Sequence, residues 1–170
     1  DITLTADRTL ATGKAEPKIG QSYLNALEAA VQITEANEGT TVTALSVGGK
    51  MLESSKARKD MLSRGPDSLS LVIDDSLSGL LPYETASVLA AAAGKVGFDL
   101  ILCGEGSGDL YAQQTGMLLG EMLGVPAINA VSSIKIEGGK VIAERTLENE
   151  VEELEIPLPA VICVTSDINN

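Results

Sequence analysis

The 170-residue sequence contains no histidine and no tryptophan, and aromatic residues make up only 2% of it. Without histidine, these residues cannot supply a Ser-His-Asp triad, a histidine general base or a histidine-ligated metal site. Because aromatic rings are so scarce while hydrophobic residues reach 44%, the core must be built from leucine, valine, isoleucine and alanine. The sequence therefore predicts an aliphatic core and excludes histidine-based catalysis.

Basic residues are also scarce. Lysine and arginine together number 12 against 24 aspartates and glutamates, which gives a net charge of −12. A nucleic-acid groove would need a local basic surface inside that negative field. We therefore expect no DNA or RNA partner.

Cysteine is limited to two positions, and no long hydrophobic run is present. Cys103 and Cys163 each end an apolar run, which is typical of buried free thiols rather than of a disulfide framework. The most apolar stretch, Ala86 to Ala93, is far too short to span a bilayer. No signal peptide pattern is visible, so we expect a cytoplasmic protein without a membrane-inserted segment. The numbering begins at Asp1 rather than at methionine, and we expect the natural start to lie outside it.

Short β-rich runs alternate with amphipathic helical segments along the chain. Helices are predicted from Ser22, where the hydroxyl can cap the first turn, and over 50–64, 82–96 and 110–123. Strands are predicted over 41–47, 69–73, 100–103, 131–136, 141–147, 151–156 and 160–164. We expect one domain over residues 1–170, an α/β fold with a doubly wound, mostly parallel sheet and an antiparallel extension.

The late strands are acidic, and a hairpin turn is predicted between two of them at residues 137–140. Paired carboxylates can perform general acid–base catalysis. Nothing in the sequence, however, indicates that the carboxylates of these strands are buried or have a partner of opposite charge. We interpret the region as a solvent-facing antiparallel ribbon whose acidic residues are Glu144, Glu148, Glu150, Glu152, Glu153 and Glu155.

The segment Gly104-Glu105-Gly106-Ser107-Gly108-Asp109 lies between an apolar run and a helical pattern. A strand, a glycine loop and a helix in this order can bring backbone N–H groups and a helix N-terminus to a phosphate. We expect Asp109 to cap a helix from Leu110 to Leu123. The spacing is not GxGxxG, so a nucleotide-binding loop and an ordinary well-capped βα loop both remain open.

Polar and small residues follow in the expected helix. Gln113 and Gln114 are adjacent and cannot both face the sheet, so one of them could reach a ligand at the loop. Ordinary helix surface is the alternative for both. A stripe of small residues recurs every four positions and lets the helix pack closely on its neighbours, at Ala112, Gly116 and Gly120.

The loop and two further blocks resemble electron transfer flavoprotein beta subunits. The first block is residues 104–116, and the second comprises 143–154 and Pro159 to Cys163, with Asn149 where the pattern has glycine or aspartate. A third block, 44–49 with 58–67, is similar to the Fix-type members associated with carnitine and acyl-CoA metabolism. The three blocks occur in order over nearly the whole chain.

The resemblance implies a Rossmann-like fold of the adenine nucleotide alpha hydrolase kind and a heterodimer with an alpha subunit. It implies FAD mainly in the alpha subunit, and AMP or a second FAD in this one. Such a protein is an electron carrier rather than an enzyme. It would connect an acyl-CoA-type dehydrogenase, in fatty acid oxidation or carnitine metabolism, to a quinone oxidoreductase or another acceptor in the bacterial cytoplasm.

Carried over by position, the resemblance implies a cofactor site that includes the strand end at Val47 and, near the flavin, Tyr23. The loop would contribute the other residues, which are Gly104, Gly106, Ser107, Gly108, Asp109, Gln113, Gln114 and Thr115. In the family a first strand precedes the region equivalent to Asp1 and a C-terminal arm follows Asn170. We expect both to lie outside residues 1–170.

Two other functions remain open from the residues. An enzyme of the ATP pyrophosphatase type has a serine- and glycine-rich loop to which Ser107-Gly108-Asp109 is faintly similar, although that loop belongs after the first strand. A stress-protein-type nucleotide-sensing module has a related fold, although the extension after Ala127 is additional to it.

Overall fold

The computed structural model describes residues 5–8, 18–107 and 111–169. Its helices are α1 (Gln21–Ala36), α2 (Ser55–Leu62), α3 (Pro82–Val96) and α4 (Thr115–Leu123), with short 3₁₀ turns η1 (Lys50–Glu53) and η2 (Asp75–Leu77). Its strands are β1 (Thr43–Gly48), β2 (Ser68–Ile73), β3 (Leu100–Gly104), β4 (Ala127–Glu137), β5 (Lys140–Thr146), β6 (Val151–Pro157) and β7 (Ala160–Val164).

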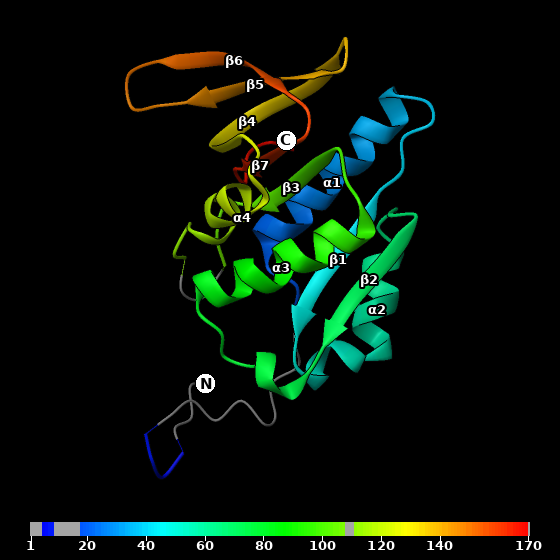
Figure 1. Cartoon of the computed structure of the whole chain (residues 1–170), viewed down its shortest axis with the longest axis vertical. Helices are drawn as coiled ribbons and strands as arrows, with labels where there is room; N and C mark the ends of the chain where they lie inside the picture. The colour runs from blue at the N-terminus through cyan, green and yellow to red at the C-terminus, as the bar shows by residue number, and fades with distance from the viewer. Residues whose placement is uncertain (1–4, 9–17, 108–110, 170) are drawn as a thin grey trace.

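The strands form an α/β fold with parallel and antiparallel parts, as predicted. Within the described residues, β1 and β2 pair in parallel as a two-stranded sheet. The other strands form a five-stranded sheet in the order β3-β7-β4-β5-β6, in which β7 runs parallel to both of its neighbours. Figure 1 shows the antiparallel β4, β5 and β6 extending away from the helices.

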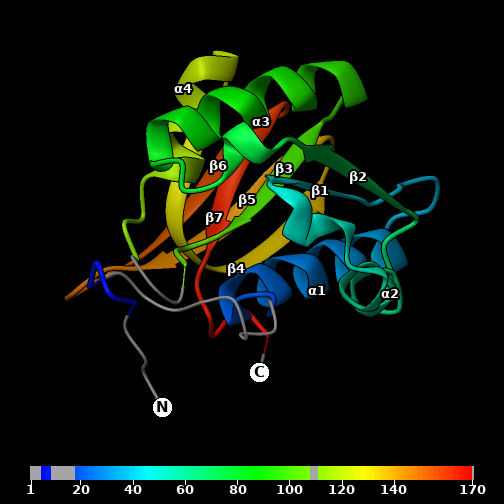
Figure 2. The ribbon, with the colours of Figure 1, turned by 90° about the horizontal axis from the view of Figure 1, so that it is seen from below.

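Helices cover both faces of the five-stranded sheet around β7 (Figure 2). Ala26 of α1 packs on one face, where the sheet contributes Ile162 and neighbouring aliphatic side chains. Ala86 of α3 and Leu119 of α4 pack on the other face against Val161. Successive residues of a strand point to opposite faces, so β7, buried along its whole length, serves both layers. The described core is aliphatic, as the composition predicts.

The acidic ribbon is built on a tight hairpin between β4 and β5. Glu137 pairs with Lys140, and both Gly138 and Gly139 have positive φ, at 58° and 76°. Two central residues with positive φ are the requirement of a type I′ turn, which explains why glycine occupies both positions. Val141, on the covered face of the ribbon, is fully buried, whereas most of the glutamates are exposed.

A bulge in β4 lets this strand join the two parts of the sheet. Ala130 has φ of 56°, and the register shifts between Ile128 and Val131 against β7 and between Val131 and Ser133 against β5. The first residues of β4 pair in parallel with β7, and those after the bulge pair antiparallel with β5. A bulge increases twist and redirects a strand, so it turns the ribbon away from the parallel part.

The structure corrects the predictions for the first two helices. Ser22 is not the cap of α1: the cap is Gly20, and the Ser22 hydroxyl instead donates a hydrogen bond to the carbonyl oxygen of Gly106. The helix predicted over 50–64 is two elements, because Ser54 interrupts it with extended backbone and caps α2 by accepting from the Ala57 N–H.

In the described residues, none of the helices has both the length and the apolar character needed to cross a lipid bilayer.

Candidate nucleotide site

The glycine loop follows β3 at its carboxyl end, as predicted, and is seated on the first turn of α1. The Glu105 N–H donates to the Val164 carbonyl oxygen at 3.0 Å, which holds the loop beside β7. Gly104 is buried, and a Cβ there would lie 2.6 Å from the backbone carbonyl carbon of Ser22. The missing side chain at Gly104 therefore allows α1 to approach the strand end, and the hydroxyl of Ser22 binds Gly106.

The predicted helix from Leu110 is wrong in its start, because α4 begins at Thr115 after Gln114. Tyr111 and Gln113 have positive φ, at 44° and 54°, and a right-handed helix does not accommodate such residues. Gly108 and Asp109 lie outside the described residues.

The Glu105 carboxylate is engaged within the loop. Its Oε1 accepts a hydrogen bond from Gln113 Nε2 at 2.9 Å. A hydrogen bond to Glu105 also raises the pKa of the Tyr111 phenol. Ser107 accepts from the Tyr111 N–H at 3.4 Å, and a Cβ on Gly106 would lie 2.8 Å from the Tyr111 ring. The backbone of Tyr111 therefore binds Ser107, and its ring lies beside Gly106.

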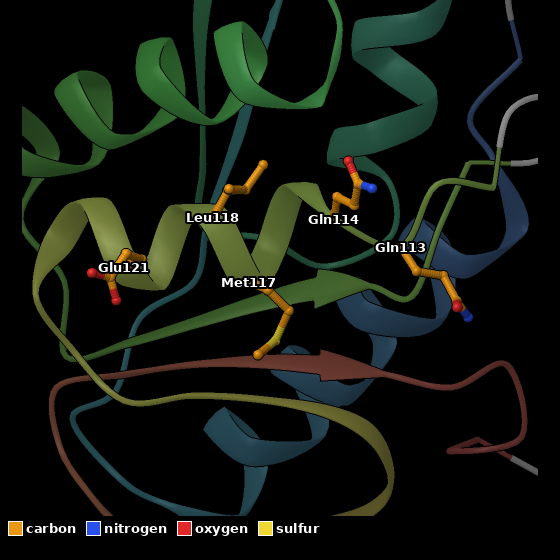
Figure 3. Close-up of a pocket in the computed structure, with 5 residues that line it drawn as sticks. All are labelled: Gln113, Gln114, Met117, Leu118 and Glu121. Carbon is orange, nitrogen blue, oxygen red and sulfur yellow. The ribbon is translucent and has the colours of Figure 1, made fainter.

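A shallow groove of about 300 Å³ runs along the start of α4. Figure 3 shows the side chains that line it, which are Gln113, Gln114, Met117, Leu118 and Glu121. Gln114 is exposed, and no hydrogen bond joins its amide to another described residue. The groove combines apolar walls with the exposed amide of Gln114.

The other predicted site residues lie on three different elements, α4, α1 and β1. Thr115 opens α4, and Tyr23, 45% exposed, lies in the first turn of α1 next to Ser22. Val47 lies at the carboxyl end of β1, in the two-stranded sheet. The structure therefore brings the first turn of α1 to the loop through Ser22, whereas Val47 lies in a different sheet.

Ser22 is the residue of this site that sequence reasoning assigned wrongly. Its partner, Gly106, is 84 residues away, so no local pattern could have revealed the contact. The only sequence signal was a hydroxyl at the start of a helix, and that signal is the same for an ordinary cap.

Within residues 5–8, 18–107 and 111–169, no group of three or more cysteine, aspartate or glutamate side chains is arranged to hold a metal ion.

The chain matches the family model for the electron transfer flavoprotein domain over residues 7–170. It belongs to the electron transfer flavoprotein domain family. The fold agrees with that family's Rossmann-like architecture, and proteins of the family are electron carriers associated with flavins and nucleotides. The pyrophosphatase and stress-protein alternatives are not favoured by this match.

The described residues around the start of α4 offer both hydrogen-bond donors and acceptors. The unpartnered Gln114 amide offers both a donor and an acceptor beside the start of α4, where the first helical N–H groups have no intrahelical partner. Gly104 and Gly106, in contrast, use their missing side chains to admit Ser22 and Tyr111.

Proposed function

We propose that this chain is the beta subunit of a heterodimeric electron transfer flavoprotein of the Fix type. The observation that carries the proposal is the loop after β3, held between α1 and α4 in a chain that matches the family over residues 7–170. Ligands of open parallel sheets bind beyond the carboxyl ends of the strands, which is where this loop lies.

In the proposed role, the chain holds a nucleotide and performs no bond-making chemistry. The Gln114 amide and the first N–H groups of α4 contact the nucleotide, with the Ser107 and Thr115 hydroxyls close to the same place. Glu105 and Tyr111 fix the loop through their hydrogen bonds to each other and to Gln113. AMP would give a structural site, whereas a second FAD would supply a further redox centre, since a flavin exchanges electrons.

The proposed electron path begins at an acyl-CoA-type dehydrogenase of fatty acid or carnitine metabolism and ends at a quinone oxidoreductase or another acceptor, in the cytoplasm. The alpha subunit would hold the main FAD. A net charge of −12 favours basic docking surfaces on such partners, because electrostatic complementarity raises association rates.

The test is to express the full chain with the alpha subunit, purify the complex and release its cofactors by denaturation. A yellow heterodimer is expected. One AMP and one FAD per dimer would identify a simple carrier, and two FAD would identify a second redox centre in this subunit. A colourless chain that forms no complex with the alpha subunit and releases no nucleotide would refute the proposal.

A further inference from the structure

The two cysteines are opposite each other on neighbouring strands. Cys103 of β3 is the direct register partner of Cys163 of β7, and both are free thiols. Paired residues of neighbouring strands project to the same face, and the strands lie about 4.8 Å apart. This separation falls inside the range of about 4.4–6.8 Å that Cα atoms span across a disulfide.

The sulfur atoms lie under the first turn of α4. A Cβ on Gly116, the second residue of that helix, would lie 2.3 Å from Cys163 Sγ and 3.6 Å from Cys103 Sγ. Both sulfur atoms therefore lie close to the same position beneath the helix, next to Gly116. The absence of a side chain at Gly116 leaves the space in which they meet.

The surroundings differ for the two thiols. A hydrogen bond from Cys103 lowers the pKa of Cys163, while the same contact and burial raise the pKa of Cys103. The sulfur of Cys163 also lies against a helix N-terminus, and the helix dipole stabilises a thiolate there. Both thiols are largely buried beneath α4. The lowered pKa and the contact with the start of α4 favour Cys163 as the nucleophile, which leaves Cys103 as the thiol that would resolve its oxidised form.

We propose that Cys103 and Cys163 form a redox-active dithiol that hydrogen peroxide converts into a cross-strand disulfide. The Cys163 thiolate attacks one peroxide oxygen, the O–O bond breaks, and the departing hydroxide takes a proton to become water. The Cys103 sulfur then attacks the resulting sulfenic sulfur, forms the S–S bond, and releases a second water. Two thiols and one peroxide become one disulfide and two waters. Dithiothreitol reverses the reaction by thiol–disulfide exchange.

The proposal is independent of the cofactor assignment, because it depends only on the strand register and the contact with α4. Its location nevertheless connects it with the candidate site. The helix above the sulfurs begins at Thr115, and Gln114 immediately precedes it. A change in the sulfur positions therefore acts first on the turn that carries these residues.

The test uses the full chain, as purified with its bound partners, treated with hydrogen peroxide and then blocked with iodoacetamide. Trypsin leaves Cys103 in the peptide 96–135 and Cys163 in the peptide that begins at Thr146. The expected result is a linked pair of these peptides in monomeric chain, with both thiols lost and both recovered after dithiothreitol. Circular dichroism before digestion verifies that the protein is still folded.

Two single variants separate the roles of the cysteines. With Cys103→Ser, dimedone is expected to trap a sulfenic acid on Cys163, because the resolving thiol is absent. With Cys163→Ser, little dimedone adduct is expected on Cys103, because the nucleophilic thiol is absent. Free thiols at both positions after peroxide treatment of folded wild-type protein would overturn the proposal. Disulfides only between chains, or sulfinic acid without a linked peptide pair, would overturn it as well.

Discussion

At the scale of single residues, several side chains near the loop have partners far along the chain. Ser22 binds Gly106, and Gly116 admits the sulfur of Cys163. Glycine is required at position 116 because of this close approach. A left-handed backbone is not the reason, because Gly116 does not have positive φ. The expected close packing of the small-residue stripe is confirmed at this position and at Gly120, where a Cβ would lie 2.4 Å from the Ala127 Cβ. Ala112 was wrongly placed in the stripe, because it precedes α4.

The Gly116→Ala substitution is expected to destabilise the protein by about 1–3 kcal/mol, because a methyl group would overlap Cys163 Sγ. Urea unfolding measures the change. Gly94→Ala is the matched control in α3: its added Cβ meets nothing within 4 Å, so stability should rise by about 0.5–1 kcal/mol. A neutral Gly116→Ala would contradict the close packing.

The Gln114→Ala substitution is expected to weaken nucleotide binding by about 1 kcal/mol, or roughly fivefold, because it removes the free amide of the groove. Titration of the stripped complex with AMP or FAD measures the effect. Gln32→Ala is the control, since this exposed amide of α1 already donates to Glu28 at 2.9 Å. Equal nucleotide affinities for the two variants would show that Gln114 does not contact the nucleotide.

The phenol of Tyr111 is expected to ionise at a higher pH than an ordinary tyrosine. A hydrogen bond to Glu105 raises its pKa, so its contribution to stability is fully present below the unfolded pKa and is lost as the pH rises through the folded pKa. Phenolate absorbance reports the titration in a Tyr23→Phe, Tyr83→Phe background. Glu105→Gln should move the titration to lower pH, and an unchanged curve would refute the contact.

At the scale of elements, the acidic ribbon is held by cross-strand pairs of different exposure. Arg145 faces Glu152 across β5 and β6, and its Nε donates to the carboxylate at 2.6 Å. The side chains of this pair are 27% and 33% exposed, against 56% and 65% for Lys140 and Glu155. A less exposed pair is less screened by water and salt.

Double-mutant cycles should therefore give a coupling of about 1 kcal/mol for Arg145 with Glu152, and about 0–0.5 kcal/mol for Lys140 with Glu155. Arg145→Ala and Glu152→Gln form the first cycle, and Lys140→Ala and Glu155→Gln form the second. Urea unfolding at low and high salt provides the free energies. A larger coupling for the Lys140 pair would contradict the ranking by exposure.

At the scale of the whole molecule, the described strands differ in how well they are buried. Every residue of β7 is buried between two helical layers, whereas β1 and β2 contain no fully buried residue and form a separate sheet. Regions with few buried contacts open with lower free energy than the core.

Hydrogen exchange of the free chain should accordingly be slowest in β7 and faster in β1 and β2. Mass spectrometry of peptides covering 43–48, 68–73 and 160–164 measures the difference. Binding of the alpha subunit provides a second condition, in which β7 serves as the internal reference. Protection in β1 and β2 equal to that of β7 would show a single cooperative unit.

Local patterns predicted most strands to within two residues, because each depends on a short apolar run bounded by turn residues. The hairpin at Gly138 and Gly139 and the start of α3 at Pro82 are confirmed for this reason. Among the strands, the exception is β4, which begins at Ala127, four residues before its predicted start. The start of α4 was wrong because its sequence is compatible with a helix, whereas the backbone at Tyr111 and Gln113 is not. The roles of the candidate site residues stay predictions.

The sequence by itself determined the aliphatic core, the order of most elements, the net charge and the family, because these follow from composition and from patterns within short windows. Tertiary structure decided which distant residues meet: Ser22 with Gly106, Cys103 with Cys163, and Gly116 with the sulfurs. The physical reason is that strand register and helix packing are set by burial of whole faces. One residue of shift in β7 would turn Cys163 away from Cys103 without changing any local pattern.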